Sequence, residues 1–395
     1  MPYSALSHLG CPRCGKDYDA HQVQGTCVCG SPLLARYDLD QVARAVSPRD
    51  IAGRPPGMWR YHELLPVGSA ASVVTLGEPM TPLLAMPRIG AELGVPRLLM
   101  KDEGLLPTGT FKARGAAAGV SRAAELGVRA IAMPTNGNAG AAWSAYAARA
   151  GLRSLIVMPS GSPPVTQAEC RAAGAEVHLV DGHIGDAGAL VSRMLAGRPG
   201  FQNVATLREP YRIEGKKTMG LEIAEQLGWR MPDVIVYPAG GGVGLIGIHK
   251  ALRELLDLGW VTGEPPRLVA VQAEACAPVV AAFTAGARSC EPWNPARTAA
   301  SVAFGIIVPQ PLGDELMLDA LYESGGTALA VSDEELLAAQ REVATAEGTL
   351  ICPESAACFA AVRRLRAGGW LSERDEVVVV STGTGLIYPE TLALA

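Results

Sequence analysis

The sequence predicts an α/β fold with mostly parallel sheets covered by helices on both faces. Short apolar runs of strand length alternate along the chain with segments of helical pattern, and 45 Gly and 29 Pro are spread between them as turn residues. Apolar residues make up 49% of the chain and charged residues 18%, a balance typical of globular proteins. The length of 395 residues predicts two or three domains.

The regular alternation begins near residue 97. The expected strands, in chain order, are 97–101, 130–133, 155–158, 177–180, 234–237, 268–272 and 377–380. The expected helices are 140–150, 166–173, 187–196, 245–258, 333–347 and 355–367. Ligands of such sheets bind at the carboxyl ends of strands, so the loops after residues 133, 237 and 380 are where chemistry is expected.

Charge and hydropathy exclude several classes of partner. The formal net charge is −5 and no run rich in Lys or Arg occurs, so neither nucleic acid nor an anionic membrane surface is expected as a partner. No apolar stretch of about 20 residues could span a bilayer, and the N-terminus lacks the pattern of a signal peptide. A cytoplasmic location is therefore expected, with five scattered cysteines as free thiols.

The first candidate site surrounds Lys112, which lies between a Pro/Thr/Gly turn and an Ala-rich helix. A lysine that is fixed there and partly desolvated has a lowered pKa, and its neutral amine can form a Schiff base. The alternative is a solvated lysine in the first turn of a helix, which is the commoner case for a single lysine.

A polar loop follows the strand predicted at 130–133. Thr135, Asn136 and Asn138 lie between that strand and the next helix, where amide side chains and exposed N–H groups suit an anion such as a carboxylate. The alternative is a strand-to-helix turn with a capping Asn.

Two further loops follow predicted strands. Residues 238–244 read Pro-Ala-Gly-Gly-Gly-Val-Gly, and successive glycine N–H groups before a helix favour a phosphate cradle over a simple tight turn. The spacing is neither that of a Walker lysine loop nor that of a complete dinucleotide loop. Ser381 and Thr382 follow the last strand, where a hydroxyl could reach a ligand. The four sites in this order are more specific than any one of them.

Four residues near the N-terminus, which we name the cysteine cluster, have the spacing Cys11-x-x-Cys14 and Cys27-x-Cys29. The spacing is similar to that of a zinc ribbon. The second pair is one residue short of Cys-x-x-Cys, which predicts strain in a tetrahedral site. A ribbon that is held by packing, without metal, is therefore the favoured interpretation, and zinc is the alternative.

Together the motifs resemble the fold-type II pyridoxal-phosphate enzymes and, among them, the threonine synthases. The segments that carry the resemblance are residues 107–115, 210–218, 304–309, 313–314 and 323–326. The likeness extends from about residue 8 almost to the C-terminus, and the cysteine cluster also recurs in one branch of threonine synthases. The resemblance implies two Rossmann-like domains, preceded here by a cysteine-containing extension, and a homodimer.

The resemblance also implies a role for each candidate residue. Lys112 would bind the cofactor as a Schiff base and move protons, Asn138 would contact the ring hydroxyl oxygen, and Thr382 would contact the pyridine nitrogen. The cofactor phosphate would be cradled by Gly240, Gly241, Gly242, Val243 and Gly244. Thr135 and Asn136 would hold the substrate carboxylate, and Arg212 would contact a substrate phosphate.

The implied domains are an N-terminal extension (1–75), a large cofactor-binding domain (76–120 and 206–395) and a small domain (121–205) that closes on substrate. The implied reaction converts O-phospho-L-homoserine and water into L-threonine and phosphate.

The sequence departs from the family pattern at Ala139, at Leu207 and in the Gly-Gly-Gly loop, and Cys352-Pro-Glu-Ser355 replaces Pro-Glu-Gly. These departures keep open a serine/threonine dehydratase, or a synthase that makes cysteate or diaminopropionate by β-replacement. A non-catalytic protein on the same fold is a third alternative, against which the intact Lys112 argues.

Overall fold

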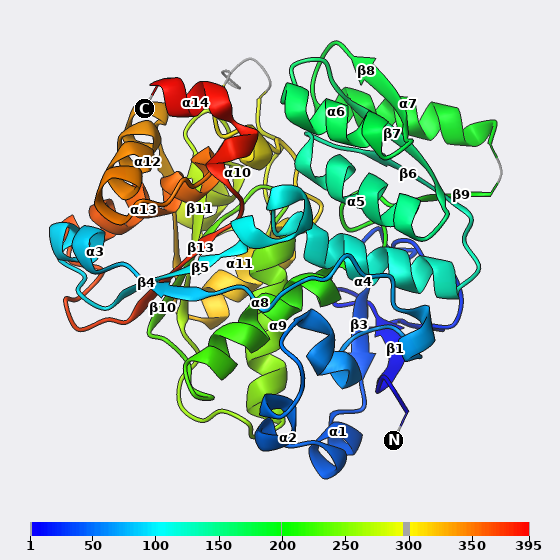
Figure 1. The fold of residues 1–395 in the computed structure, drawn as a ribbon, viewed down its shortest axis with the longest axis horizontal. Coiled ribbons are helices and arrows are strands. Elements are labelled where there is room, and N and C mark those ends of the chain that lie inside the picture. Colours follow the sequence, from blue (N-terminus) through cyan, green and yellow to red (C-terminus); the bar gives the residue numbers. More distant parts are fainter. Residues whose placement is uncertain (1, 199, 295–300, 395) are drawn as a thin grey trace. The chain divides into compact units, whose positions relative to one another are not determined.

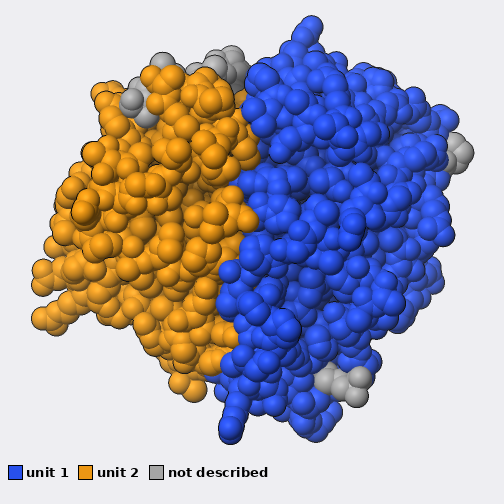
Figure 2. All heavy atoms as spheres, viewed as in Figure 1, with its two compact units in different colours: residues 1–80, 106–218, 254–260 blue, residues 81–105, 219–253, 261–395 orange. Residues whose placement is uncertain are grey.

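The computed structural model describes residues 2–198, 200–294 and 301–394. The chain divides into two compact units, which Figure 2 colours separately. Unit 1 comprises residues 1–80, 106–218 and 254–260, and unit 2 comprises residues 81–105, 219–253 and 261–395. This division rests on packing alone. The three domains expected from the sequence include one that closes on substrate, and their boundaries stay a prediction.

Unit 1 contains a four-stranded parallel sheet (Figure 1). Its strand order is β8 (Glu176–Val180), β7 (Arg153–Pro159), β6 (Ala130–Pro134) and β9 (Phe201–Asn203). The helices of this part are α4 (Lys112–Glu125), α5 (Asn138–Arg149), α6 (Pro164–Ala172) and α7 (Ile184–Ala196).

Alternate residues of these strands enter two separate cores. Ile131 and Met133 of β6 pack with residues of α4 and α5, whereas Ala132 between them packs with Ala187 and Val191 of α7. Because side chains of a strand point alternately to opposite faces, the two cores lie on opposite faces of the sheet. The sheet is therefore covered on both sides, as a parallel sheet requires.

A second, small sheet in unit 1 is built from the N-terminal residues. The antiparallel strands β1 (Leu6–Gly10), β2 (Asp17–Tyr18) and β3 (Leu34–Tyr37) have the order β2-β1-β3. The chain continues through α1 (Leu39–Ala45), α2 (Pro48–Ala52) and the 3-10 helices η1 (Met58–Leu64) and η2 (Ala70–Ser72).

Unit 2 contains a six-stranded sheet. Its strand order is β12 (Thr327–Val331), β11 (Arg267–Ala273), β10 (Val234–Pro238), β13 (Val377–Ser381), β5 (Leu98–Asp102) and β4 (Leu83–Ala85). All neighbours pair in parallel except β4, which is antiparallel at the edge. The carboxyl ends of β10, β13 and β5 therefore meet at one edge of this sheet.

Helices and short 3-10 turns surround this sheet. They are α3 (Pro87–Leu93), η3 (Glu103–Leu105), α10 (Pro278–Thr284), η6 (Phe304–Ile306), α11 (Asp314–Glu323), α12 (Asp333–Glu347), α13 (Pro353–Ala367), η7 (Gly385–Ile387) and α14 (Pro389–Leu394). Helices α8 (Arg212–Gln226) and α9 (Val243–Asp257) contribute residues to both units. The core contains Val234 and Val236 of β10 with residues of α3, α12 and α13, and the intervening Ile235 is fully buried as well.

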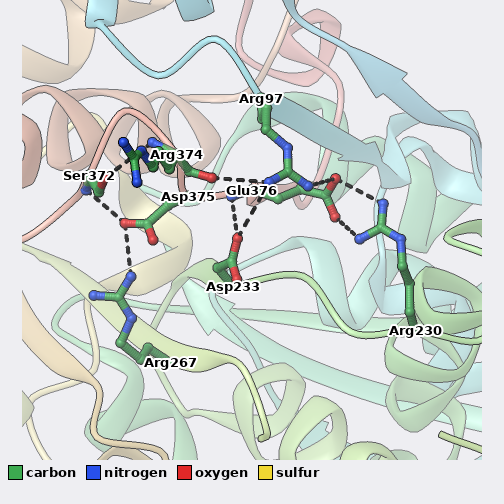
Figure 3. Close-up of polar contacts among 8 residues, drawn as sticks. All are labelled: Arg97, Arg230, Asp233, Arg267, Ser372, Arg374, Asp375 and Glu376. Atoms are coloured by element: carbon green, nitrogen blue, oxygen red, sulfur yellow. Dashed lines mark hydrogen bonds and ion pairs between the residues drawn. The ribbon is translucent and has the colours of Figure 1, made fainter. Parts of the chain in front are cut away.

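Ion pairs connect the amino ends of the unit 2 strands, opposite to the edge where ligands are expected. The network comprises Arg97, Arg230, Asp233, Arg267, Ser372, Arg374, Asp375 and Glu376 (Figure 3). Arg97 Nη2 and Arg230 Nη2 each lie 2.9 Å from Glu376 Oε2. The hydrogen bonds from Arg230, and then those from Arg97, lower the pKa of the Glu376 carboxyl.

The predicted α/β class is confirmed, and each of the seven strands expected from the sequence overlaps an observed one. The three loops where the sequence analysis expected chemistry directly follow β6, β10 and β13. Within the part of the chain that the structure describes, no helix has the length and apolar character needed to cross a membrane.

Candidate active site

Lys112 is the first residue of α4, after a tightly turned loop. The 3-10 turn η4 (Pro107–Gly109) precedes it, and Thr108 has a φ of 61°, a value that side-chain-bearing residues adopt only under constraint. The Lys112 side chain is half-buried, and its Nζ lies 4.1 Å from the centroid of the Phe111 ring. The amine is therefore partly shielded from solvent, and its role as the cofactor lysine stays a prediction.

Three other lysines are buried, namely Lys101, Lys216 and Lys217. Lys101 Nζ lies 2.6 Å from a carboxylate oxygen of Glu222, and Lys217 Nζ lies 2.7 Å from one of Glu214. A neighbouring carboxylate favours the charged ammonium, which is not nucleophilic. Lys216 donates to the carbonyl of Phe111, and its Nζ lies 4.2 Å from the same ring that Lys112 contacts.

Helices α4 and α8 touch through two glycines. A Cβ on Gly115 would lie 3.0 Å from Lys216 Cε and 3.1 Å from the carbonyl oxygen of Arg212. A Cβ on Gly215 would lie 2.9 Å from the Cα of Gly115. The missing side chains allow this close approach between the first turns of two helices, one of which begins at Lys112 and the other at Arg212.

Arg212 is buried and held in one orientation by its surroundings. Its Nε donates to Glu209 Oε1 at 2.7 Å, its Nη1 donates to Thr206 Oγ1 at 3.2 Å, and its Nη2 donates to the carbonyl of Val204. The guanidinium carbon lies 4.8 Å from the centroid of the Trp143 ring. Among the described residues these bonds use three of the five N–H donors, so two remain for an anion.

Glu209 has a second role beside the pairing with Arg212. Its carboxylate accepts the N–H groups of Tyr211 at 2.9 Å and of Arg212 at 3.2 Å, at the amino end of α8. The N–H groups in the first turn of a helix have no partner within the helix, so this carboxylate satisfies two of them. Leu207, in the same loop, has a φ of 63° although it carries a side chain.

The polar loop after β6 also depends on close packing. Thr135 Oγ1 accepts N–H groups from Gly137 and Gly140, both at 3.0 Å, and thereby closes the turn before α5. Gly137 has a φ of +132°, and Asn138 is the first residue of α5. The turn is therefore closed by Thr135 and not by a capping Asn, and Asn136 and Asn138 are half-buried.

The glycine loop joins β10 to α9 and leaves no free space for a Cβ at Gly242 or Gly244. A Cβ on Gly242 would lie 2.9 Å from Met317 Cε, and one on Gly244 would lie 2.6 Å from Tyr237 Cε2. Gly242 also has a φ of +78°. The N–H groups in the first turn of the 15-residue helix α9 have no helical partner and suit a phosphate, so the loop fits the phosphate of pyridoxal phosphate.

Thr382 follows β13, the neighbour of β10 in the sheet, so its loop and the glycine loop leave adjacent strand ends. Its N–H donates to Ser355 Oγ at 2.8 Å, and its Oγ1 lies 3.7 Å from Cys352 Sγ. Burial, and then the charge of Glu354, raise the pKa of the Cys352 thiol, which is therefore neutral. Thr382 is itself buried, and its two contacts here are an uncharged hydroxyl and an uncharged thiol.

The predicted site residues thus fall into two sets. Lys112, Thr135, Asn136, Asn138 and Arg212 belong to unit 1, and Gly240–Gly244 and Thr382 belong to unit 2. The sequence analysis missed Glu209 and Ser355, which hold Arg212 and Thr382. The spacing of Glu209 three residues before Arg212 could have indicated the first pair, whereas no local signal indicated the second.

Comparisons with known proteins agree with this geometry. A family model described as "Pyridoxal-phosphate dependent enzyme" matches residues 74–383. The chain is 37% identical over 389 residues to a threonine synthase of Methanosarcina acetivorans, covering 98% of this chain and 94% of that protein. It is 35% identical over 381 residues to a threonine synthase of Methanocaldococcus jannaschii, covering 96% and 93%.

Among solved structures, the processed form of threonine deaminase isoform 2 from Solanum lycopersicum superposes with a TM-score of 0.67. The two chains share 18% identity, and the match covers 94% of this chain and 99% of the other. At this identity the likeness concerns the fold alone. The family matches confirm the resemblance and the cofactor expected from the sequence: the chain belongs to the pyridoxal-phosphate-dependent enzymes of fold type II and, within them, to the threonine synthase family.

Proposed function

We propose that this enzyme converts O-phospho-L-homoserine and water into L-threonine and phosphate. The crossing of α4 and α8 supports the proposal: the first turn of α4, which begins at Lys112, packs through Gly115 against Arg212 and Lys216, two cationic residues suited to a phosphate ester. A dehydratase, which acts on unphosphorylated serine or threonine, has no need of such a pair. Membership of the threonine synthase family supports the same substrate.

Each site residue has a proposed role toward the cofactor. Bound pyridoxal phosphate supplies the electron sink that makes protons on the substrate carbons acidic. Lys112 holds the cofactor through its Nζ, Asn138 contacts the ring hydroxyl oxygen, and Gly240–Gly244 hold the phosphate at the amino end of α9. Thr382 pairs with the ring nitrogen through a neutral hydroxyl, which adds no charge and so limits carbanion accumulation.

Other residues have proposed roles toward the substrate. Thr135 Oγ1 already accepts two N–H groups, so its O–H hydrogen is directed to an acceptor such as the substrate carboxylate, beside Asn136. Arg212 binds the substrate phosphate with the N–H groups that the loop leaves available. Lys112 Nζ takes protons from the substrate carbons and returns them, and it is the general acid and base of the reaction.

A comparison of four substrates tests the proposal. The reconstituted enzyme receives O-phospho-L-homoserine, L-threonine, L-serine or O-phospho-L-serine, and released phosphate, 2-oxo acid and amino acids are measured. We expect equal amounts of phosphate and threonine from O-phospho-L-homoserine alone, and no product with the Lys112→Ala variant. Inert O-phospho-L-homoserine together with 2-oxo acid from serine or threonine would establish the dehydratase instead.

We also propose that the enzyme works as a homodimer in the cytoplasm. The dimer is the habit of the family that the sequence resembles, and nine free cysteines suit a reducing compartment. Light scattering of the purified holoenzyme tests the first point, since a monomeric mass at micromolar concentration would refute it. Fractionation of native cells tests the second.

A further inference from the structure

The sulfur atoms of the cysteine cluster converge on one point at the end of the three-stranded sheet. All four Sγ atoms lie within 4.8 Å of one another, and the Cys11–Cys29 and Cys14–Cys27 pairs are each 3.5 Å apart. A zinc ion with Zn–S bonds of about 2.3 Å has sulfurs about 3.8 Å apart at the corners of its tetrahedron. We propose that one zinc ion is bound by the four thiolates of this cluster.

The short second pair does not keep the sulfurs apart, because glycines let both turns close. Gly15 has a φ of +71° and donates to the carbonyl of Cys11 at 3.0 Å. Gly30 has a φ of +88° and donates to the carbonyl of Cys27 at 2.8 Å. The first turn closes over four residues and the second over three, which matches the shorter spacing of the second pair, and the positive φ at Gly30 relieves the strain that we expected there.

Hydrogen bonds to sulfur suit thiolates more than packed thiols. The N–H of Cys14 donates to Cys11 Sγ at 3.4 Å, and Tyr18 Oη donates to Cys27 Sγ at 3.2 Å. Such donors to ligand atoms orient a metal site and stabilise its negative charge. Four soft sulfur ligands in this arrangement select zinc or iron rather than a hard cation, and each thiol releases its proton to solvent when the metal binds.

The small sheet around the cluster has too little apolar core to be stable without a cross-link such as a bound metal ion. Its strands have five, two and four residues, and its buried core consists of only a few side chains, among them Leu9, Leu33 and Ala35. Cys14 and Cys29 are exposed, so they add nothing to this core as packed thiols. Small modules with so little apolar core are usually held by metals or disulfides, and all four cysteines are free thiols here.

The loop between the two cysteine pairs also contacts the start of α8. The inference drawn from this contact rests on the function proposed for Arg212. The carbonyl of Ala20, in the loop between the two cysteine pairs, accepts Tyr211 Oη at 3.0 Å and Arg122 Nη2 at 2.7 Å. Tyr211 directly precedes Arg212. The loop that the zinc ion holds therefore positions Arg212, the residue proposed to bind the substrate phosphate.

Metal analysis of the full-length holoenzyme tests the zinc site without any reference to activity. We expect about one zinc ion per chain in the wild type and in Cys290→Ser, a control outside the cluster, and less than about one-tenth of this in Cys14→Ser/Cys29→Ser. If the double variant does not fold, metal release from the wild type by a mercurial thiol reagent gives the same stoichiometry. Wild type without metal, wild type with iron, or a disulfide found by intact mass would each overturn the proposal.

The positioning role has a separate test. Tyr211→Phe removes the hydroxyl that contacts Ala20 while it leaves all four cysteines in place. We expect unchanged zinc content, an unchanged cofactor spectrum, and a KM for the phosphorylated substrate raised severalfold with little change in kcat. An unchanged KM would overturn this role, whereas a wild-type enzyme that is inactive on that substrate but has its full zinc content would refute the proposed function and leave the zinc site standing.

Discussion

Replacement of Gly215 by alanine tests whether the contact between α4 and α8 is as close as the structure has it. A Cβ at this position would lie 2.5 Å from the carbonyl carbon of Arg114 and closer still to its oxygen. Ordinary van der Waals contact begins near 3.4 Å, so the two helix backbones would have to separate by about 1 Å. Backbone atoms cannot turn away as a flexible side chain can.

The expected cost in stability follows from this displacement. Overpacking of a well-packed interior destabilises by about 1–3 kcal/mol, which lowers the unfolding midpoint of a unit of this size by roughly 2–12 °C. The displacement also moves Lys112 relative to Arg212. A misplacement of about 1 Å can reduce catalysis about a hundredfold, so we expect a large loss of kcat/KM as well.

Thermal unfolding followed by circular dichroism measures the first effect, and phosphate release measures the second. Gly185→Ala is the matched control, because Gly185 lies on an exposed part of α7 with nothing within 4 Å of the added Cβ. The free energy of unfolding of this control variant should be unchanged or raised by up to about 1 kcal/mol. A Gly215→Ala enzyme with the stability and activity of the control would refute the packing described here.

Three further substitutions probe other contacts. Arg212→Lys loses the planar fork that suits a phosphate, so KM for O-phospho-L-homoserine should rise about tenfold or more while kcat changes less; steady-state kinetics decide this, and an unchanged KM would place the phosphate elsewhere. Ser355→Ala removes the acceptor of the buried Thr382 N–H, which should lower stability by about 1–3 kcal/mol and speed the loss of pyridoxal phosphate in dialysis; unchanged cofactor retention would contradict the role of Thr382. Glu376→Gln should cost about 1 kcal/mol at pH 7, because its partner Arg230 is half-exposed, and should leave kcat unchanged. The folded-state pKa of Glu376 is lowered, so the wild type should have the larger free energy of unfolding above the ordinary glutamate pKa of about 4.3. This difference should disappear as pH falls through the folded-state pKa. Denaturant titrations of both proteins between pH 7 and pH 3 measure it, and a difference that does not depend on pH would contradict the prediction.

Long apolar strands were predictable from the sequence because burial on both faces leaves a continuous apolar run. Strands β6, β10 and β13 are nearly all buried, and each was expected within one or two residues of its observed bounds. Strand β12 was missed because its Thr-Ala-Leu-Ala-Val sequence is only half-buried and has weak strand propensity. Strand β9, with three residues, is too short to give a periodic pattern.

The candidate site was predictable where chemistry and local sequence coincide. Lys112, the polar loop after β6 and the glycine loop each follow a recognisable turn, so their elements could be placed along the chain. The α4–α8 crossing could not be predicted, because Gly115 and Gly215 are distant in sequence and neither has an unusual backbone conformation that would require glycine. Convergence of the cysteine sulfurs was missed for a similar reason, since it depends on the backbone conformation at Gly30 and not on the spacing alone.

Borohydride reduction of the holoenzyme tests the central claim, that Lys112 carries the cofactor, most directly. Reduction fixes pyridoxal phosphate to the amine that holds it, and peptide mass spectrometry then identifies the lysine. Lys216 is the internal comparison, since its amine lies against the same Phe111 ring. We predict the phosphopyridoxyl group on Lys112 alone; its presence on Lys216, on Lys101 or on no lysine would contradict the account.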